Sequence, residues 1–448
     1  MHFLLPLLVA LFASDATAKI CRNLTVAVNI EARQGVFSIP DLQGNLDATA
    51  FAQRLTSNHG NYTEDALDGY QTVEGTYNIS TTFCQPDTNA SGTTVQVLSH
   101  GIGYDKTYWD IRYENGNYSY VDVAVDEYGY STVAIDRFGI GNSSHGHPLN
   151  LIQAPAEISA LHEITKLLRN GSFPTVPTAF KNIITVGHSF GSIQVYTLSA
   201  LDPSAQDALI LTGFSGDTAY LPATIAAWNL HLARLNQPSR FGSARPRTTP
   251  SRFDRPVNLY TLLAQSLRGA GLSDSEVQQE LTTTELANLL AGSNATSTTS
   301  DSAAAAPQDL PAGYLTWPDF SANQYTFFYP GAFDLGLGLQ IEATKQPVTT
   351  GELLTLASFP GSTGFAGPVQ VVTGEKDAIF CGGDCYAVGA GSSASNIPAE
   401  VAPAFPNASV FEAYVQPNTG HAINAHYNAT GAYHAVQRFL GANGFGAS

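Results

Sequence analysis

Basic residues are scarce in this chain: 20 Lys and Arg stand against 37 Asp and Glu among its 448 residues. Nucleic acids and anionic membranes attract proteins chiefly through Lys and Arg, so the formal net charge of −17 argues against both as partners. The charge fits a soluble protein and leaves the chemistry open.

Long apolar runs are also missing. The run at residues 3–13 falls far short of the ~20 residues that a membrane-spanning helix needs. It precedes the small-residue pattern Ala16-Thr17-Ala18, which is typical of a secretory signal peptide. We predict a signal peptide at residues 1–18, no stable membrane anchor and an extracellular location. Its removal takes away Asp15 alone among charged residues, which leaves 20 basic and 36 acidic residues and a net charge of −16.

Cysteine is rare, and no closely spaced His pair supplements it, so a zinc or redox site is not expected. An even number of cysteines in an oxidising compartment favours disulfides. Three connectivities are possible, and we favour Cys21 with Cys84 and Cys381 with Cys385. The second pair brackets a short Gly-Gly-Asp loop.

Glycosylation sequons are abundant by contrast. Ten N-x-S/T sites in one chain predict a glycosylated surface and support export. They lie at Asn23, Asn61, Asn78, Asn89, Asn117, Asn142, Asn170, Asn294, Asn407 and Asn428.

Short β-rich runs that end in Gly-rich loops alternate with helical patterns, which predicts a mainly parallel sheet covered by helices on both faces. The runs lie at residues 94–99, 131–136, 182–186, 208–212, 369–373 and 409–415. Apolar residues follow one helical face across 157–169. Two further strand-like runs, 24–30 and 77–83, predict an N-terminal β extension.

The alternation stops after residue 212 and resumes near residue 368. Helical patterns at 223–235, 257–270 and 274–291 fill this gap, together with a low-complexity tract at 292–307 that we read as a loop. We therefore predict a core formed by residues 19–215 and 351–448, with a cap or lid inserted at 216–350.

The strongest chemical signal is Gly187-His188-Ser189-Phe190-Gly191, between the apolar run 183–186 and the helical run 193–200. A strand before and a helix after are the context in which G-x-S-x-G carries a catalytic serine. There the serine oxygen lies at a helix N-terminus, where backbone N–H groups stabilise developing negative charge. The pattern predicts that Ser189 is a nucleophile.

A second glycine-containing turn, 99–103, follows an earlier strand. Its backbone and the N–H after the nucleophile are the usual partners of an oxyanion hole, so we assign the donors to Ile102 and Phe190. His100 in this turn is interpreted as structural, because the base of such a site comes later in the chain.

The stretches HGIGYD, AIDRFGIGNSSHG and VGHSFGS resemble the α/β-hydrolase superfamily, and more narrowly its secreted fungal serine hydrolases. The resemblance is strong over 95–214, resumes at 368–440 and is weak in the insertion. It implies a triad in the chain order Ser, acid, His. Matching residue by residue, it places Ser189 as nucleophile, Asp377 as acid and His421 as base.

Alternatives remain open for the acid and the base. Glu375, Asp384 and Asp217 are rival acids, and His426 and His434 are rival bases that fall in a helical run. Asp136 and Arg137 are interpreted as structural, as a charge-assisted pair, with a substrate role for Arg137 as the second reading.

The sequence thus predicts hydrolysis of a carboxylic ester or related acyl bond on a small molecule, without cofactor or metal. An apolar or aromatic substrate moiety is expected from an aromatic cluster in the cap. Lactonase, thioesterase, lipase, peptidase and tailoring activities are the enzymatic alternatives, and a catalytically silent binding protein is the other class. Oligomeric state is open. The aromatic cluster in the cap comprises Trp317, Phe320, Tyr325, Phe327, Phe328, Tyr329 and Phe333.

Overall fold

The computed structural model describes residues 19–87, 92–113, 117–176, 179–243, 273, 275 and 307–446. Several predictions fall outside these residues. They are the signal peptide at 1–18, the sequons at Asn89 and Asn294, the helical patterns at 257–270 and (apart from residue 275) 274–291, and the low-complexity tract up to residue 306.

The centre of the fold is an eight-stranded sheet in the order β1-β2-β4-β3-β5-β6-β10-β11. From β4 to β11 each strand pairs parallel with its neighbour, and β1 and β2 add an antiparallel edge. The predicted α/β-hydrolase fold is confirmed. The parallel strands are β3 (Thr94–Ser99), β4 (Ser131–Ile135), β5 (Asn182–His188), β6 (Ala208–Thr212), β10 (Val369–Gly374) and β11 (Phe411–Gln416).

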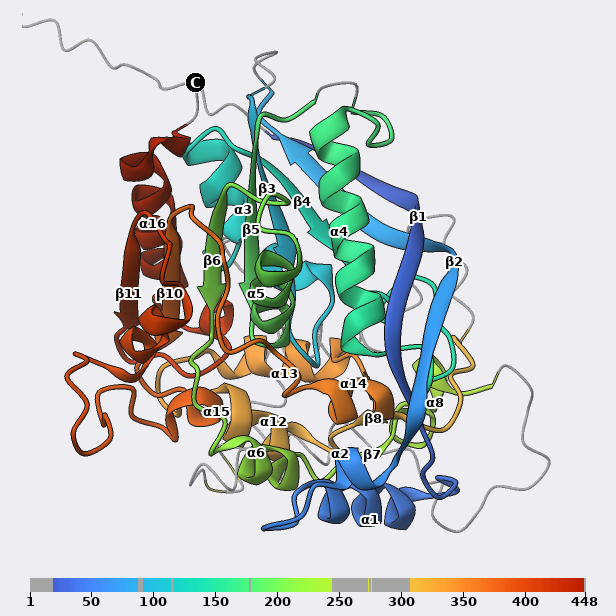
Figure 1. Cartoon of the computed structure of the whole chain (residues 1–448). Helices are drawn as coiled ribbons and strands as arrows, with labels where there is room; N and C mark the ends of the chain where they lie inside the picture. The colour runs from blue at the N-terminus through green and yellow to red at the C-terminus, as the bar shows by residue number, and fades with distance from the viewer. Residues whose placement is uncertain are drawn as a thin grey trace, which may run out of the picture.

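Helices cover both faces of this sheet (Figure 1). On one face lie α4 (Ala154–Asn170) and α5 (Phe190–Leu201); on the other lie α3 (Tyr120–Asp122), η2 (Val123–Glu127) and α16 (Ala429–Leu440). Because both faces are covered, the residues of the central strands β3, β4, β6 and β10 are all buried rather than alternately buried and exposed.

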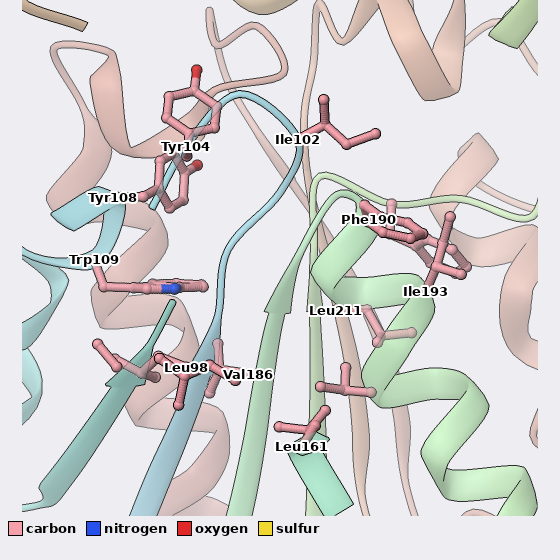
Figure 2. Close-up of a cluster of buried hydrophobic side chains, with 14 of the residues drawn as sticks. Leu98, Ile102, Tyr104, Tyr108, Trp109, Leu161, Val186, Phe190, Ile193 and Leu211 are labelled. Atoms are coloured by element: carbon pink, nitrogen blue, oxygen red, sulfur yellow. The ribbon is translucent and has the colours of Figure 1, made fainter. Parts of the chain in front are cut away.

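The core fills the space on both faces of the central strands (Figure 2). Leu98 of β3, Val186 of β5 and Leu211 of β6 are completely buried. Each such side chain contributes on the order of 1.5–3 kcal/mol of burial free energy, which makes the strand ends a rigid base for the loops that follow them. No helix among the described residues is long and apolar enough to cross a membrane.

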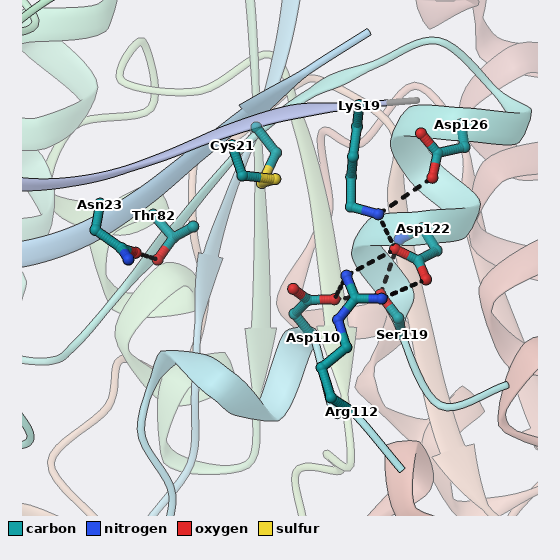
Figure 3. Close-up of a disulfide and its surroundings, with 10 residues drawn as sticks. Lys19, Cys21, Asn23, Thr82, Asp110, Arg112, Ser119, Asp122 and Asp126 are labelled. Carbon is teal, nitrogen blue, oxygen red and sulfur yellow. Dashed lines mark hydrogen bonds and ion pairs between the residues drawn. A yellow bond between two sulfur atoms is a disulfide. The ribbon is translucent and has the colours of Figure 1, made fainter. Parts of the chain in front are cut away.

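The N-terminal extension is a long antiparallel ribbon of β1 (Ile20–Phe37) and β2 (Leu67–Gln85). Both strands are longer than predicted. The disulfide between Cys21 and Cys84 joins them across the ribbon, next to ion pairs of Lys19 with Asp122 and Asp126 (Figure 3). Helices α1 (Asn45–Leu55) and α2 (Tyr62–Asp65) connect the strands. Helix α1 contacts two elements of the insertion, α6 (Leu221–Trp228) and β7 (His231–Leu232).

The segment between β6 and β10 lies beyond the carboxyl ends of the parallel strands (Figure 1). Its predicted helix at 223–235 is wrong as a single element, because Asn229 adopts a left-handed conformation (φ 45°) and splits it. A small antiparallel sheet of order β7-β8-β9 ties the segment together. Its elements are α6 (Leu221–Trp228), β7 (His231–Leu232), α7 (Ala233–Asn236), α8 (Pro238–Phe241), β8 (Tyr314–Thr316), α12 (Phe320–Phe327), α13 (Leu335–Thr344), β9 (Val348–Thr349) and α14 (Thr350–Thr355).

We call this inserted segment the cap, and its boundaries at 216 and 350 stay predictions. Short helical turns complete the core: η1 (Lys106–Trp109), α15 (Ala378–Cys381), η3 (Ile397–Ala404), η4 (Ile423–Ala425) and η5 (Gly441–Phe445).

Candidate active site

Ser189 occupies a sharp turn between β5 and α5. Its backbone has φ 55° and ψ −118°, a conformation that costs a non-glycine residue on the order of 1–3 kcal/mol and that clusters at functional sites. A Cβ on Gly187 would lie 2.5 Å from the backbone of Gly191, and one on Gly191 would lie 2.2 Å from the carbonyl oxygen of Ser99. The spacing of the two glycines around the serine is therefore a packing requirement of this turn.

Asp377 and His421 follow the two last parallel strands and meet in the interior. His421 Nδ1 donates to Asp377 Oδ2 at 2.7 Å, since an ionised carboxylate only accepts, and both side chains are fully buried. The other oxygen, Oδ1, accepts the N–H groups of Ile379 and Phe380 at 2.8 Å each, because Asp377 is the N-cap of α15. The cap hydrogen bonds fix the carboxylate so that one oxygen faces the imidazole.

The rival acids bind elsewhere. Each accepts a backbone N–H group, and no hydrogen bond joins any of the three to His421 in the described structure. Glu375 accepts from Asn418, Asp384 from Tyr386 and Asp217 from Ala219.

The rival bases, His426 and His434, also form contacts elsewhere. His426 lies before α16 and not within it, which corrects the predicted helical run. Its Nδ1 donates to the carbonyl of Ala422, and its Nε2 accepts the N–H groups of Gly420 and Tyr329 at 3.0 Å each. Burial lowers the pKa of His426 to about 4, so it is neutral and holds the loop before His421 against the cap. His434, in α16, contacts Tyr128 at the periphery.

The loops after β3, β5 and β11 converge. The ring of His188, next to Ser189, lies 4.9 Å from the ring of His421, centroid to centroid. A Cβ on Gly101 would lie 2.8 Å from the Cβ of Ser189, which places the turn after β3 directly beside the serine. His421 Nε2 is buried, and no other described residue hydrogen bonds to it. The turn, the serine and the Asp–His pair thus form one cluster.

The turn after β3 is held by His100. Its Nε2 accepts the N–H of Arg137 at 3.1 Å, so Nδ1 carries the proton and donates to the carbonyl of Gly101 at 2.9 Å. Burial, with Arg137 nearby, holds the pKa of His100 well below its ordinary value. These contacts agree with a structural histidine. Within the described chain the N–H groups of Ile102 and Phe190 donate no hydrogen bond, and both residues lie above the strand ends in Figure 2.

Asp136 and Arg137 do not pair with each other, contrary to the sequence interpretation. Asp136 binds the ammonium group of Lys106 at 2.9 Å, whereas the Arg137 guanidinium lies between two buried glutamates, Glu157 and Glu352. Burial holds the pKa of Glu157 well above its usual value, against the pull of Arg137. Neighbours along a strand end point to opposite sides, so adjacent charges find separate partners.

The Arg137 guanidinium also lies over the ring of Phe190, 4.9 Å from its centroid. Gln194 of α5 donates to Glu157 at 2.7 Å. The cluster of Arg137, Glu157 and Glu352 therefore packs against the first turns of α5. Sequence analysis missed it, because Glu157 and Glu352 are distant in the chain and look like ordinary helix residues.

The aromatic residues of the cap are mostly core residues. Five of the seven are buried, whereas Tyr325 is exposed and Tyr329 partly so. The Phe327 ring lies 5.7 Å from that of His421, and the Phe380 ring lies at the same distance. Aromatic surface therefore surrounds the histidine.

A sequence profile described as "Alpha/beta hydrolase family" matches residues 96–430, which include every residue of the cluster above. The chain belongs to the alpha/beta hydrolase family. No curated protein sequence matches it. The similarity to secreted fungal members therefore rests on the sequence motifs alone.

Solved structures of other alpha/beta hydrolases align with most of this family member. A thermophilic esterase from Thermogutta terrifontis is 14% identical with a TM-score of 0.41, covering 82% of this chain and 94% of the esterase. Est1E from Butyrivibrio proteoclasticus, solved with ferulic acid, is 12% identical with a TM-score of 0.39, and the alignment covers 82% of this chain and 96% of Est1E. A bromoperoxidase from Bacillus anthracis is 15% identical with a TM-score of 0.42, and the alignment covers 82% of this chain and 96% of the bromoperoxidase. Similarities this distant say nothing about the substrate of this hydrolase.

Proposed function

We propose that this protein is a secreted serine hydrolase that cleaves a carboxylic ester or a related acyl bond through an acyl-enzyme. The observation that carries the proposal is the strained Ser189 turn beside the buried His421–Asp377 pair. Nucleophile, base and orienting acid are the three roles that acyl transfer requires.

In the first step His421 Nε2 takes the proton of Ser189 Oγ as that oxygen attacks the acyl carbon. Asp377 Oδ2 accepts from Nδ1, which keeps the lone pair on Nε2 and stabilises the imidazolium that forms. The imidazolium then protonates the leaving group. Water attacks the acyl-enzyme in the reverse sequence of proton transfers and releases the acid.

The oxyanion of each tetrahedral intermediate is assigned to the N–H groups of Ile102 and Phe190. Support comes from their lack of other acceptors within the described chain and from the position of Phe190 at the first turn of α5. The helix dipole favours negative charge there.

A small-molecule ester with an apolar or aromatic part suits the rings of Phe327 and Phe380 beside His421.

Secretion is supported by the predicted signal peptide, by two disulfides and by the exposure of sequon asparagines. The eight sequon asparagines among the described residues are all exposed: Asn23, Asn61, Asn78, Asn117, Asn142, Asn170, Asn407 and Asn428. Intact-mass measurement before and after deglycosylation of the secreted protein tests occupancy.

A fluorophosphonate probe tests the proposal directly. It should label Ser189 in the wild type and leave Ser189→Ala unlabelled. A panel of p-nitrophenyl esters of graded chain length, lactones and acyl thioesters then separates esterase, lactonase and thioesterase activity, with Ser189→Ala as control. Folded wild type that is neither labelled nor active would favour the silent binding protein.

A further inference from the structure

The cap contains a buried charged pair that the proposed chemistry does not use. Glu342 of α13 and Lys345 just after it are 7% and 2% exposed, and they form an ion pair. Glu342 Oε2 also accepts Trp317 Nε1 and Asn323 Nδ2, both at 2.9 Å. Lys345 Nζ donates to the carbonyl of Trp317 at 2.7 Å. Both charges therefore hold Trp317, one through its side chain and one through its backbone.

Trp317 lies directly against the turn after β3. A Cβ on Gly103 would lie 2.1 Å from Cη2 of the indole, and Gly103 has φ 84°, so both space and conformation require glycine here. The indole is 1% exposed. It lies against Gly103, which follows Ile102, the proposed oxyanion donor.

The cap binds the same turn a second time. The backbone N–H of Gln346 donates to the carbonyl of Gly103 at 2.9 Å, and its side-chain Nε2 donates to Asp105 Oδ2 at 2.8 Å. Gln346 is the residue after Lys345. One short segment of the cap therefore holds Trp317 and also fixes the peptide group that follows Gly103.

We propose that Trp317 is a positioning residue for the oxyanion hole: held by Glu342 and Lys345, it presses on Gly103 and fixes the direction of the Ile102 N–H. The inference rests on the proposed function, because it assumes that Ile102 is a donor. Oxyanion donors act only within about 2.7–3.1 Å of the charged oxygen, and losing one costs about 10²–10³ in kcat. A donor that is displaced rather than removed costs less.

The test compares Trp317→Phe with Trp228→Phe. Trp228 is 3% exposed, stacks on Trp317 with ring centroids 6.2 Å apart and donates Nε1 to Thr326, so the two variants remove an indole from the same aromatic cluster. The closest side-chain atoms to Gly103 belong to Trp317 alone. Trp228→Phe is therefore the matched control for lost packing.

Two experiments are compared. The first measures the second-order rate constant for labelling of Ser189 by a fluorophosphonate, which needs the oxyanion hole but no known substrate. The second measures kcat and KM on a p-nitrophenyl ester. We expect Trp317→Phe to lower the labelling rate and kcat by about tenfold or more with KM nearly unchanged. Trp228→Phe should stay within about twofold, at a similar loss of Tm.

Equal rates for the two variants would overturn the inference while leaving the proposed function intact. A folded wild type that is not labelled would overturn both. Glu342→Gln is a second variant that keeps the side-chain size but leaves one acceptor oxygen where there were two, so it cannot accept both from Lys345 on one side and from Trp317 on the other. It should lower the labelling rate in the same direction, and an unchanged rate in folded protein would count against the inference.

Discussion

The sheet core and the cap position their functional residues in different ways. In the core, Ser189 follows β5 and Asp377 follows β10, two strands that are buried on both faces. His421 follows the edge strand β11, which is buried only at its carboxyl end. In the cap, Trp317 follows the short strand β8 and Phe327 is the last residue of the short helix α12. Side-chain hydrogen bonds and the Glu342–Lys345 pair hold Trp317. The core thus holds the three residues of the proposed triad, and the cap packs against the loops around them.

The largest expected effect tests whether the chemistry resides in the core alone. His421→Ala should lower kcat by several orders of magnitude, because it removes the proposed base. Phe327→Leu, a cap change beside the same ring, should lower kcat by about tenfold at most. Steady-state kinetics on one p-nitrophenyl ester measures both, and a loss of similar size in the two variants would break the comparison.

The identity of the acid is tested by a matched pair of asparagine variants. Asp377→Asn should reduce kcat by several orders of magnitude, since an amide in its place no longer selects the correct imidazole tautomer. Asp217→Asn should leave kcat nearly intact. The reverse result would show that Asp217 is the acid.

The buried ion clusters of the two regions should differ in stability. Arg137→Met leaves Glu157 and Glu352 facing each other without a cation, a loss on the order of 3–5 kcal/mol. Lys345→Met should cost less, because Glu342 keeps the donors Trp317 and Asn323. Urea denaturation gives the two free energies of unfolding, and the ranking fails if Lys345→Met is the less stable variant.

The two disulfides should separate stability from activity. Cys21 and Cys84 are 63 residues apart, so replacing both by Ser should cost about 4 kcal/mol on the chain-entropy scale and spare kcat. Cys381 and Cys385 are four residues apart and close the loop after Asp377. Their replacement by Ser should cost below about 3 kcal/mol but lower kcat, because the acid loses its support. Tm and kcat of the two double variants check this, and the opposite pattern would contradict it.

The smallest expected effect concerns pH, at the contact between core and cap. His426 has a pKa of about 4 when folded and about 6.5 when unfolded, so the native state holds its proton less tightly. Its contribution to stability is complete above pH 6.5 and is lost as the pH falls toward 4, by about 3 kcal/mol at most. Urea denaturation between pH 7 and 4 should show a shallower decline in His426→Gln than in the wild type. Parallel declines would mean that His426 does not titrate in this range.

Local sequence patterns predicted the core well, because its strands and the Ser189 turn each depend on residues close together in the chain. The runs that form β3, β5, β6 and β10 are rich in β-branched and aliphatic residues, and glycine around Ser189 is required by the turn itself. The ribbon strands β1 and β2 were predicted too short, because their ends pair through backbone hydrogen bonds while exposing polar side chains. Helix α13 was missed, since its sequence LGLGLQIEAT contains two glycines.

The sequence by itself determined the fold class, the Ser189 turn and the order of the proposed triad, because each depends on neighbours in the chain or on strand ends that must meet at one edge of the sheet. Only the tertiary structure decided which carboxylate faces His421, which glutamates surround Arg137 and that Trp317 lies on Gly103. These contacts join residues 44, 20 and 214 positions apart, from the numbers of each pair in the sequence. No local pattern encodes such contacts, because they arise only when distant elements pack together and buried polar groups must find their partners there.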